Sequence, residues 1–196
     1  MQPFPARPRI FYMSESDKEL ALRCSRGDSD AFGRIVDAYQ DRLYSFSLRL
    51  LNNPSSAEEA AQESFVRAFV SISSYDSRYE FAPWIFRILH NVCVDFMRGS
   101  GRCVSIDAED FPELPDGCKP VEETVMESLD SERIEALLSS LPPVYSEALL
   151  LQYRENMGPA DIARVIGVPE GTVKARVFRG REMIKARLAW KADATV

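Results

Sequence analysis

The chain contains a single histidine and only four cysteines among its 196 residues. The cysteines, Cys24, Cys93, Cys103 and Cys118, lie far apart and form no Cys-x-x-Cys pair. Zinc sites and disulfide-rich folds both need closely spaced ligands or cysteines, so the sequence predicts neither. Unpaired thiols favour a reducing compartment, and we expect a cytoplasmic protein. A redox pair formed by Cys103 and Cys118 is left open as an alternative.

Long apolar runs are also missing. The most apolar stretches, ALLLQY and RLYSFSLRLL, are far shorter than the roughly 20 residues needed to cross a bilayer, so no membrane insertion is expected. The N-terminal stretch MQPFPARPRIFYM has three prolines and lacks the continuous apolar segment of a secretory signal. We interpret residues 1–13 as a flexible extension, and Met13 is as plausible a translation start as Met1.

Two further features are absent from the first hundred residues. No stretch alternates apolar and polar residues for long enough to predict a strand. There is also no phosphate-binding glycine loop, no carboxylate cluster and no nucleophile with basic partners. The sequence therefore predicts an all-α protein that is not an enzyme and that uses no cofactor or metal.

What the sequence does contain is helical periodicity. A helix is predicted from Asp28, a plausible N-cap, to a stop at Asn52, Asn53 and Pro54. A second is predicted from Ala57 to Ile72, preceded by Ser56, which has the spacing of a capping box with Glu59. Its predicted inward face is Ala61, Phe65, Ala68, Phe69 and Ile72. A third carries Pro83 in its first turn, and its predicted core face is Ile85, Ile88, Leu89, Val92 and Phe96.

Charge divides the chain into parts. The net charge is -6, yet residues 99–135 alone carry 11 acidic and 3 basic residues. That segment is also rich in glycine and proline, so residues 101–128 are predicted to be a flexible acidic linker. It would join two small helical domains, residues 14–100 and 129–191.

A basic helix closes the second domain. The stretch PEGTVKARVFRGREMIKARL, residues 169–188, holds six Lys or Arg and two Glu. Val173, Val177, Ile184 and Leu188 are predicted to form its packing seam, with basic residues along both edges. A short helix opened by Pro159 and a turn at Gly167 precede it, which is the layout of a helix-turn-helix. We therefore expect this domain to bind DNA.

Together the two halves resemble the sigma-70 superfamily, and specifically the extracytoplasmic-function (ECF, group 4) RNA polymerase sigma factors. The resemblance is carried by LNNPSSAEEAAQESFVRAF and PWIFRILHNVCVDFMR in the first half and by DIARVIGVPEGTVKARVFRGREMIKARL in the second. It implies a sigma-2-like helical bundle, a sigma-4-like helix-turn-helix domain and promoter-specific transcription initiation with core RNA polymerase.

The resemblance also implies roles for particular residues. The residues expected to dock on the clamp-helix coiled coil of the polymerase are Glu58, Glu59, Gln62, Glu63 and Arg67. Those expected to read and melt the minus-ten element are Tyr75, Tyr79, Phe81, Trp84, Arg87, Asn91 and Arg98. Those expected to read the minus-thirty-five element are Glu170, Gly171, Thr172, Lys174, Ala175, Arg176, Arg179 and Arg181.

Further partners follow from the same resemblance. The hydrophobic surround of the basic helix is expected to dock on the polymerase flap, the acidic linker suits the RNA-exit channel, and an anti-sigma protein is expected as regulator. Two positions depart from the family pattern. Ser146 replaces a common Arg, which puts a phosphate or flap contact in doubt, and Gly158-Pro159 changes the helix entry.

Two other functions are weighed against this one. A stand-alone helix-turn-helix regulator would bind duplex DNA without polymerase, usually at a symmetric operator. A DNA recombinase would need a catalytic cluster, and the first hundred residues show none.

Overall fold

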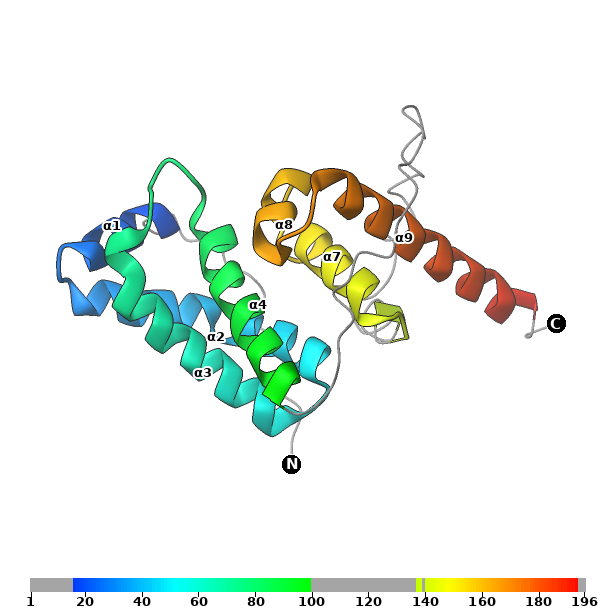
Figure 1. Cartoon of the computed structure of the whole chain (residues 1–196), viewed down its shortest axis with the longest axis horizontal. Helices are drawn as coiled ribbons and strands as arrows, with labels where there is room; N and C mark the ends of the chain where they lie inside the picture. The colour runs from blue at the N-terminus through cyan, green and yellow to red at the C-terminus, as the bar shows by residue number, and fades with distance from the viewer. Residues whose placement is uncertain (1–15, 100–136, 139, 194–196) are drawn as a thin grey trace.

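The computed structural model describes residues 16–99, 137, 138 and 140–193, and within these ranges every regular element is a helix (Figure 1). The first domain contains α1 (Asp17–Ser25), α2 (Ser29–Leu51), α3 (Pro54–Ser71), a short 3₁₀ turn η1 (Ile72–Ser74) and α4 (Phe81–Gly99). The second contains α7 (Pro143–Tyr153), α8 (Pro159–Ile166) and α9 (Glu170–Asp193). The all-α prediction is confirmed for the described residues.

Helix α1 is an element that the periodicity did not reveal, because it is only 9 residues long. Its signal is local. The backbone amide of Glu19 donates to the Ser16 hydroxyl at 3.3 Å, and the Ser16 amide donates back to the Glu19 carboxylate at 2.8 Å, which is a capping box. The Tyr39 hydroxyl then donates to Asp17 at 2.5 Å and ties α1 to α2.

The ends of α2 are as predicted, but the start of α3 is not. Asp28 caps α2 by accepting from the Ala31 amide at 3.1 Å, and Asn52 ends it in the left-handed conformation with φ 49°. Helix α3 begins at Pro54, three residues before the predicted start at Ala57. Asn53 is its N-cap, accepts from the Ser56 amide at 3.0 Å and is followed by Pro54 at the first helical position. The capping box predicted at Ser56 is therefore wrong, because Asn53 already supplies the cap and Pro54 needs no amide partner.

The helix-turn-helix is confirmed in the second domain. Gly167 ends α8 in the left-handed conformation with φ 71°, which a residue without a Cβ adopts at little cost. Val173, Val177 and Ile184 of the predicted seam are buried, and Leu188 packs partly against the core. Helix α9 also approaches α7 closely. A Cβ added at Gly180 would lie 2.8 Å from Cδ1 of Leu149.

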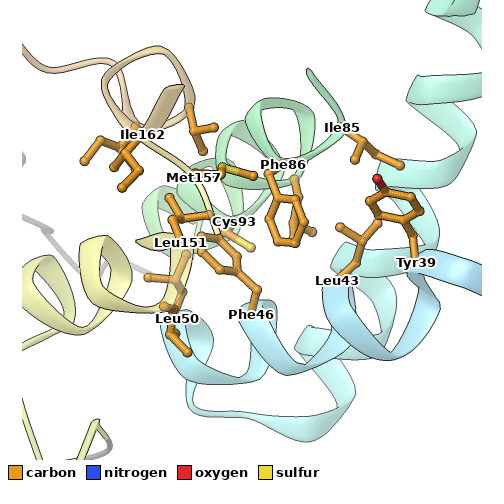
Figure 2. Close-up of a cluster of buried hydrophobic side chains, with 14 of the residues drawn as sticks. Tyr39, Leu43, Phe46, Leu50, Ile85, Phe86, Cys93, Leu151, Met157 and Ile162 are labelled. Carbon is orange, nitrogen blue, oxygen red and sulfur yellow. The ribbon is translucent and has the colours of Figure 1, made fainter. Parts of the chain in front are cut away.

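The two domains pack against each other, α4 on α8 and α2 on α7 (Figure 1). Figure 2 shows the apolar side chains that meet at this junction: Phe46, Leu50, Phe86 and Cys93 of the first domain, and Leu151, Met157 and Ile162 of the second. Phe86, Cys93 and Met97 are buried although they lie off the predicted core face of α4. A second buried face exists because the second domain covers it.

One residue of the predicted inward face of α3 lies outward. Phe69 is 52% exposed, whereas Ala57, Ala60 and Ser64 are fully buried. The close packing of α3 on α2 uses small residues, which leave no room for the Phe69 ring. The extension at 1–13, the linker at 101–128 with Cys103 and Cys118, and the first part of the second domain lie outside the described residues.

Candidate protein and nucleic-acid interfaces

The outer face of α3 is polar at its N-terminal end. Glu58, Glu59 and Gln62 are exposed, Glu63 is half-buried, and the Gln62 amide donates to Glu58 at 3.4 Å. Opposite them, Ala57, Ala60 and Ala61 are buried against the domain core. A helix that buries alanine on one side and presents carboxylates on the other is firmly held while its charges stay available to a basic partner.

Arg67 belongs to the same face but is engaged within the chain. Its guanidinium donates to Glu63 at 2.8 Å and to Asp95 of α4 at 3.2 Å. These contacts hold α3 and α4 together at the surface. Arg67 therefore orients Glu63, which the sequence alone did not reveal.

The C-terminal end of this face is apolar, which the sequence analysis missed. Val66, Phe69 and Val70 are 59, 52 and 77% exposed. They follow Gln62 and Glu63 at steps of three and four residues, so they continue the acidic row along the helix. The Phe69 ring is supported from below by Phe32, at 4.9 Å between ring centroids. Exposed apolar residues beside a charged row mark a protein contact surface.

Four aromatic residues lie in the loop between η1 and α4 and in the first turn of α4, and they have two different roles. Tyr75 and Phe81 are 9 and 1% exposed, and their ring centroids lie 5.4 Å apart. The expectation that both rings contact bases does not fit this conformation, because they form the core beneath the loop. Trp84 is half-buried against the same pair, with ring centroids 5.6 Å from Tyr75. Tyr79 alone of the four lies outward, 51% exposed.

Three polar residues of α4 lie on one exposed face. Arg87, Asn91 and Arg98 are separated by four and seven residues, and all three side chains are exposed. Asp95 lies between Asn91 and Arg98 and is neutralised by Arg67. This row can contact a phosphate backbone and the edge of a base next to the aromatic loop.

The first turn of α9 presents its predicted residues to the surface. Glu170, Gly171 and Lys174 are exposed and Thr172 is half-buried. Lys174 pairs with Glu170 at 2.9 Å across one turn, an exposed contact that a phosphate can replace at little cost. Arg179 and Arg181 are half-buried, and the Arg181 guanidinium lies 5.3 Å from the centre of the Tyr153 ring.

Ala175 and Arg176 are placed differently. They are only 2 and 5% exposed, so neither can touch DNA in this conformation. The Arg176 side chain lies near Glu147 of α7 and His90 of α4. Burial raises the pKa of Glu147 and lowers that of His90, and the Arg176 charge lowers both values by a smaller amount. Its Nε is buried and makes no hydrogen bond within the described residues. Arg176 therefore faces the junction between the domains.

His90 and Glu147 meet at this junction. Nε2 of His90 lies 3.1 Å from Oε1 of Glu147, but the two are not aligned for a hydrogen bond. Burial raises the pKa of Glu147 to about 8 and lowers the pKa of His90 to about 4. Both groups are therefore mainly uncharged at neutral pH. Cys93 beside them is also buried, which raises its pKa to about 12, so this thiol is inert.

Neither a metal-ion cluster nor a membrane-spanning helix occurs in the part of the chain that the structure describes. No group of three or more His, Cys, Asp or Glu side chains there could hold a metal ion. None of the described helices is both long and apolar enough to cross a membrane.

Comparison with known proteins gives matches over both domains. The sequence matches the family descriptions Sigma-70 region 2 over residues 35–103 and Sigma-70, region 4 over residues 131–184. It is 34% identical over 180 residues to ECF RNA polymerase sigma factor SigW of Bacillus subtilis, covering 87% of this chain and 96% of that protein. It is 32% identical to ECF RNA polymerase sigma factor SigE of Mycolicibacterium smegmatis, covering 93% of this chain and 72% of that protein.

Solved structures show the same fold. The sigma factor RpoE of Bartonella quintana, solved in complex with the anti-sigma factor NepR, matches with a TM-score of 0.60 and 25% identity over 81% of this chain and 96% of that chain. CnrH, solved with the cytosolic domain of CnrY, matches with a TM-score of 0.63 and 22% identity over 89% of this chain and 98% of that chain.

Proposed function

The chain belongs to the extracytoplasmic-function RNA polymerase sigma factors of the sigma-70 family, and we propose that it directs promoter-specific initiation through three surfaces. The first is the outer face of α3, which binds core polymerase. The second is the Tyr79 loop with the exposed row of α4, which engages the minus-ten element. The third is the first turns of α9, which read the minus-thirty-five element.

The observation that carries the polymerase surface is the division of α3 into a buried alanine side and an exposed acidic side. The apolar patch of Val66, Phe69 and Val70 extends this surface toward the end of the helix. A coiled coil with basic residues and an apolar stripe, which the clamp helices of the polymerase are expected to offer, complements both parts.

The minus-ten surface combines an aromatic ring with a polar row. Tyr79 supplies an exposed ring on which an unstacked base can lie. Arg87, Asn91 and Arg98 follow along α4 and can bind the adjacent backbone. Tyr75, Phe81 and Trp84 support the loop from below, and we propose a positioning role for them.

The minus-thirty-five surface is the exposed N-terminal part of α9. Glu170, Gly171, Thr172 and Lys174 lie where a recognition helix meets base edges, and Arg179 and Arg181 follow toward the phosphates. Ala175 and Arg176 belong to the same turns but are covered in this structure.

We propose an anti-sigma protein as regulator and the cytoplasm as location. RpoE of Bartonella quintana was solved bound to such a protein, and this chain shares its fold and 25% of its residues. A sigma factor acts where core polymerase is, which supports the location. The stand-alone regulator is not favoured by any observation on the chain or its relatives.

Reversal of charge on α3 tests the polymerase surface. The variant Glu58→Lys with Glu59→Lys is expected to lower affinity for core polymerase at least tenfold, because two favourable charge pairs become repulsive. The matched control is Asp37→Lys with Asp41→Lys, two exposed carboxylates of α2 that receive the same change of charge. Binding of labelled protein to purified core enzyme is the measurement. Equal loss in both double variants would show a general charge effect and would contradict the assignment.

A further inference from the structure

Polar contacts cross the junction between the two domains at three points. Arg42 of α2 donates from Nε to Oε2 of Glu155, which follows α7, at 2.9 Å. His90 of α4 lies against Glu147 of α7. At the third point the Arg164 guanidinium of α8 lies 4.7 Å from the centre of the Tyr79 ring.

The contact of Arg42 with Glu155 is well built. The Arg42 guanidinium lies 4.1 Å from the centre of the Tyr39 ring and 5.8 Å from that of Phe86. Both rings belong to the first domain, so they hold Arg42 in place independently of Glu155. The Glu155 side chain is 7% exposed and that of Arg42 is 28% exposed. A charge pair that is largely removed from water and held on both sides is stronger than an ordinary surface pair.

The junction involves residues of both proposed DNA surfaces. One face of the Tyr79 ring in the minus-ten loop lies against the Arg164 guanidinium of the helix-turn-helix, although Tyr79 remains 51% exposed. Arg176 of the recognition helix is buried toward His90 and Glu147. The two promoter elements lie about two turns of B-DNA apart, or about 70 Å, so one duplex cannot reach both surfaces while they touch.

We propose that this chain closes on itself without a partner, that Arg42 and Glu155 latch the closed state, and that the latch must open before both promoter elements are read. The proposal rests on the DNA surfaces assigned above. The connection between the domains permits opening. The linker predicted at residues 101–128 can span at most about 100 Å when extended, which exceeds the separation of the elements.

The chemistry of the junction suits a reversible contact. Oε1 of Glu147 and Nε of Arg176 are buried without a hydrogen bond in the described part of the chain. Buried polar atoms without partners cost free energy that opening returns, because water then solvates them. A permanent domain interface would be expected to satisfy these groups or to replace them with apolar residues. Loss of the latch pair is therefore expected to shift the balance toward the open state, against the apolar contacts of Figure 2 that favour the closed one.

The single histidine of the chain provides a readout of opening. His90 is mostly buried by the second domain, with its side chain 13% exposed, and becomes exposed when the domains part. Diethyl pyrocarbonate modifies neutral imidazole, so the rate of modification at His90, followed by mass spectrometry of its peptide, reports the open fraction. The wild-type rate is expected to be well below that of N-acetylhistidine at the same pH.

Charge reversal and exchange test the latch. Glu155→Arg places two guanidinium groups together and is expected to raise the rate at His90 on the order of a hundredfold, which corresponds to about 2.8 kcal/mol. Exchange of the pair, Arg42→Glu with Glu155→Arg, is expected to restore most of the protection. Glu182→Arg, the same change on the exposed face of α9, is the control and should leave the rate unchanged. Circular dichroism verifies that each variant is folded.

Three results would overturn the proposal. A wild-type rate equal to that of N-acetylhistidine would mean that the free chain is open. Continued protection in Glu155→Arg would mean that this pair is not the latch, and failure of the exchange to restore protection in a folded protein would mean the same. None of these measurements uses polymerase or DNA, so loss of the latch and loss of the proposed function can be told apart.

Discussion

The buried carboxyl group of Glu147 should make the folded chain less stable as pH rises. Its side chain is 7% exposed and burial raises its pKa from 4.5 to about 8. A group whose pKa is raised in the folded state contributes its full stability below its unfolded pKa and loses it as pH rises through the folded value. The relevant window is therefore between about pH 4.5 and pH 8.

The magnitude follows from the shift. At pH 7 the folded protein keeps the Glu147 proton, whereas the unfolded chain has lost it because pH 7 is about 2.5 units above the unfolded pKa. At 1.36 kcal/mol for each unit, this difference makes the free energy of unfolding about 3 kcal/mol smaller at pH 7 than at pH 4.5. Glu147→Gln removes the titration and keeps the shape. Its unfolding free energy relative to wild type should therefore rise by about 3 kcal/mol between pH 4.5 and pH 7.

Urea denaturation of both proteins at the two pH values is the assay. The change between the pH values carries the test, because any packing effect of the amide is the same at both. Glu182→Gln, an exposed carboxylate of α9, is the control and should show no such change. A constant difference between Glu147→Gln and wild type would mean that Glu147 is ionised in the fold, paired with Arg176, and would refute the reasoning.

Three further predictions follow from the fold. Gly180→Ala should destabilise the second domain by about 1 to 3 kcal/mol in thermal denaturation, because the added Cβ meets Leu149 at 2.8 Å; an unchanged midpoint would mean that the Leu149 side chain moves aside at little cost. Asn53→Ala should lower the free energy of unfolding in urea by about 1 kcal/mol and Ser56→Ala should hardly change it, because Asn53 is the cap. A larger loss in Ser56→Ala than in Asn53→Ala would mean that Ser56 caps the helix instead. Protection of His90 from diethyl pyrocarbonate should weaken as pH rises from about 6.5 to 8, because Glu147 takes up a proton when the domains close. A modification rate, relative to N-acetylhistidine, that stays constant over this range would contradict that coupling.

Periodicity was sufficient for the long helices and for their main buried faces. The seam of α9 could be predicted from Val173, Val177 and Ile184 because a helix buries what its own repeat aligns. The short α1 carried too few apolar repeats to be found this way, and its capping box at Ser16 and Glu19 was the signal that could have found it.

Packing between segments far apart in the sequence could not be read from local pattern. Phe69 looked like a core residue because it follows the repeat, but small residues of α3 fill the contact with α2. Phe86 and Cys93 lie off the predicted core face and are buried where α4 meets both α2 and the second domain. For the same reason, the sequence predicted Arg176 as a DNA contact and could not reveal that it faces the domain junction.

The central claim is that this chain makes core RNA polymerase start transcription at specific promoters. Run-off transcription of genomic promoter fragments with purified core enzyme tests it directly. The account predicts transcripts of defined length that require the chain and that disappear with Glu58→Lys and Glu59→Lys but persist with the Asp37 and Asp41 control. Tight, specific binding to duplex DNA without polymerase, and no transcript when polymerase is added, would contradict it.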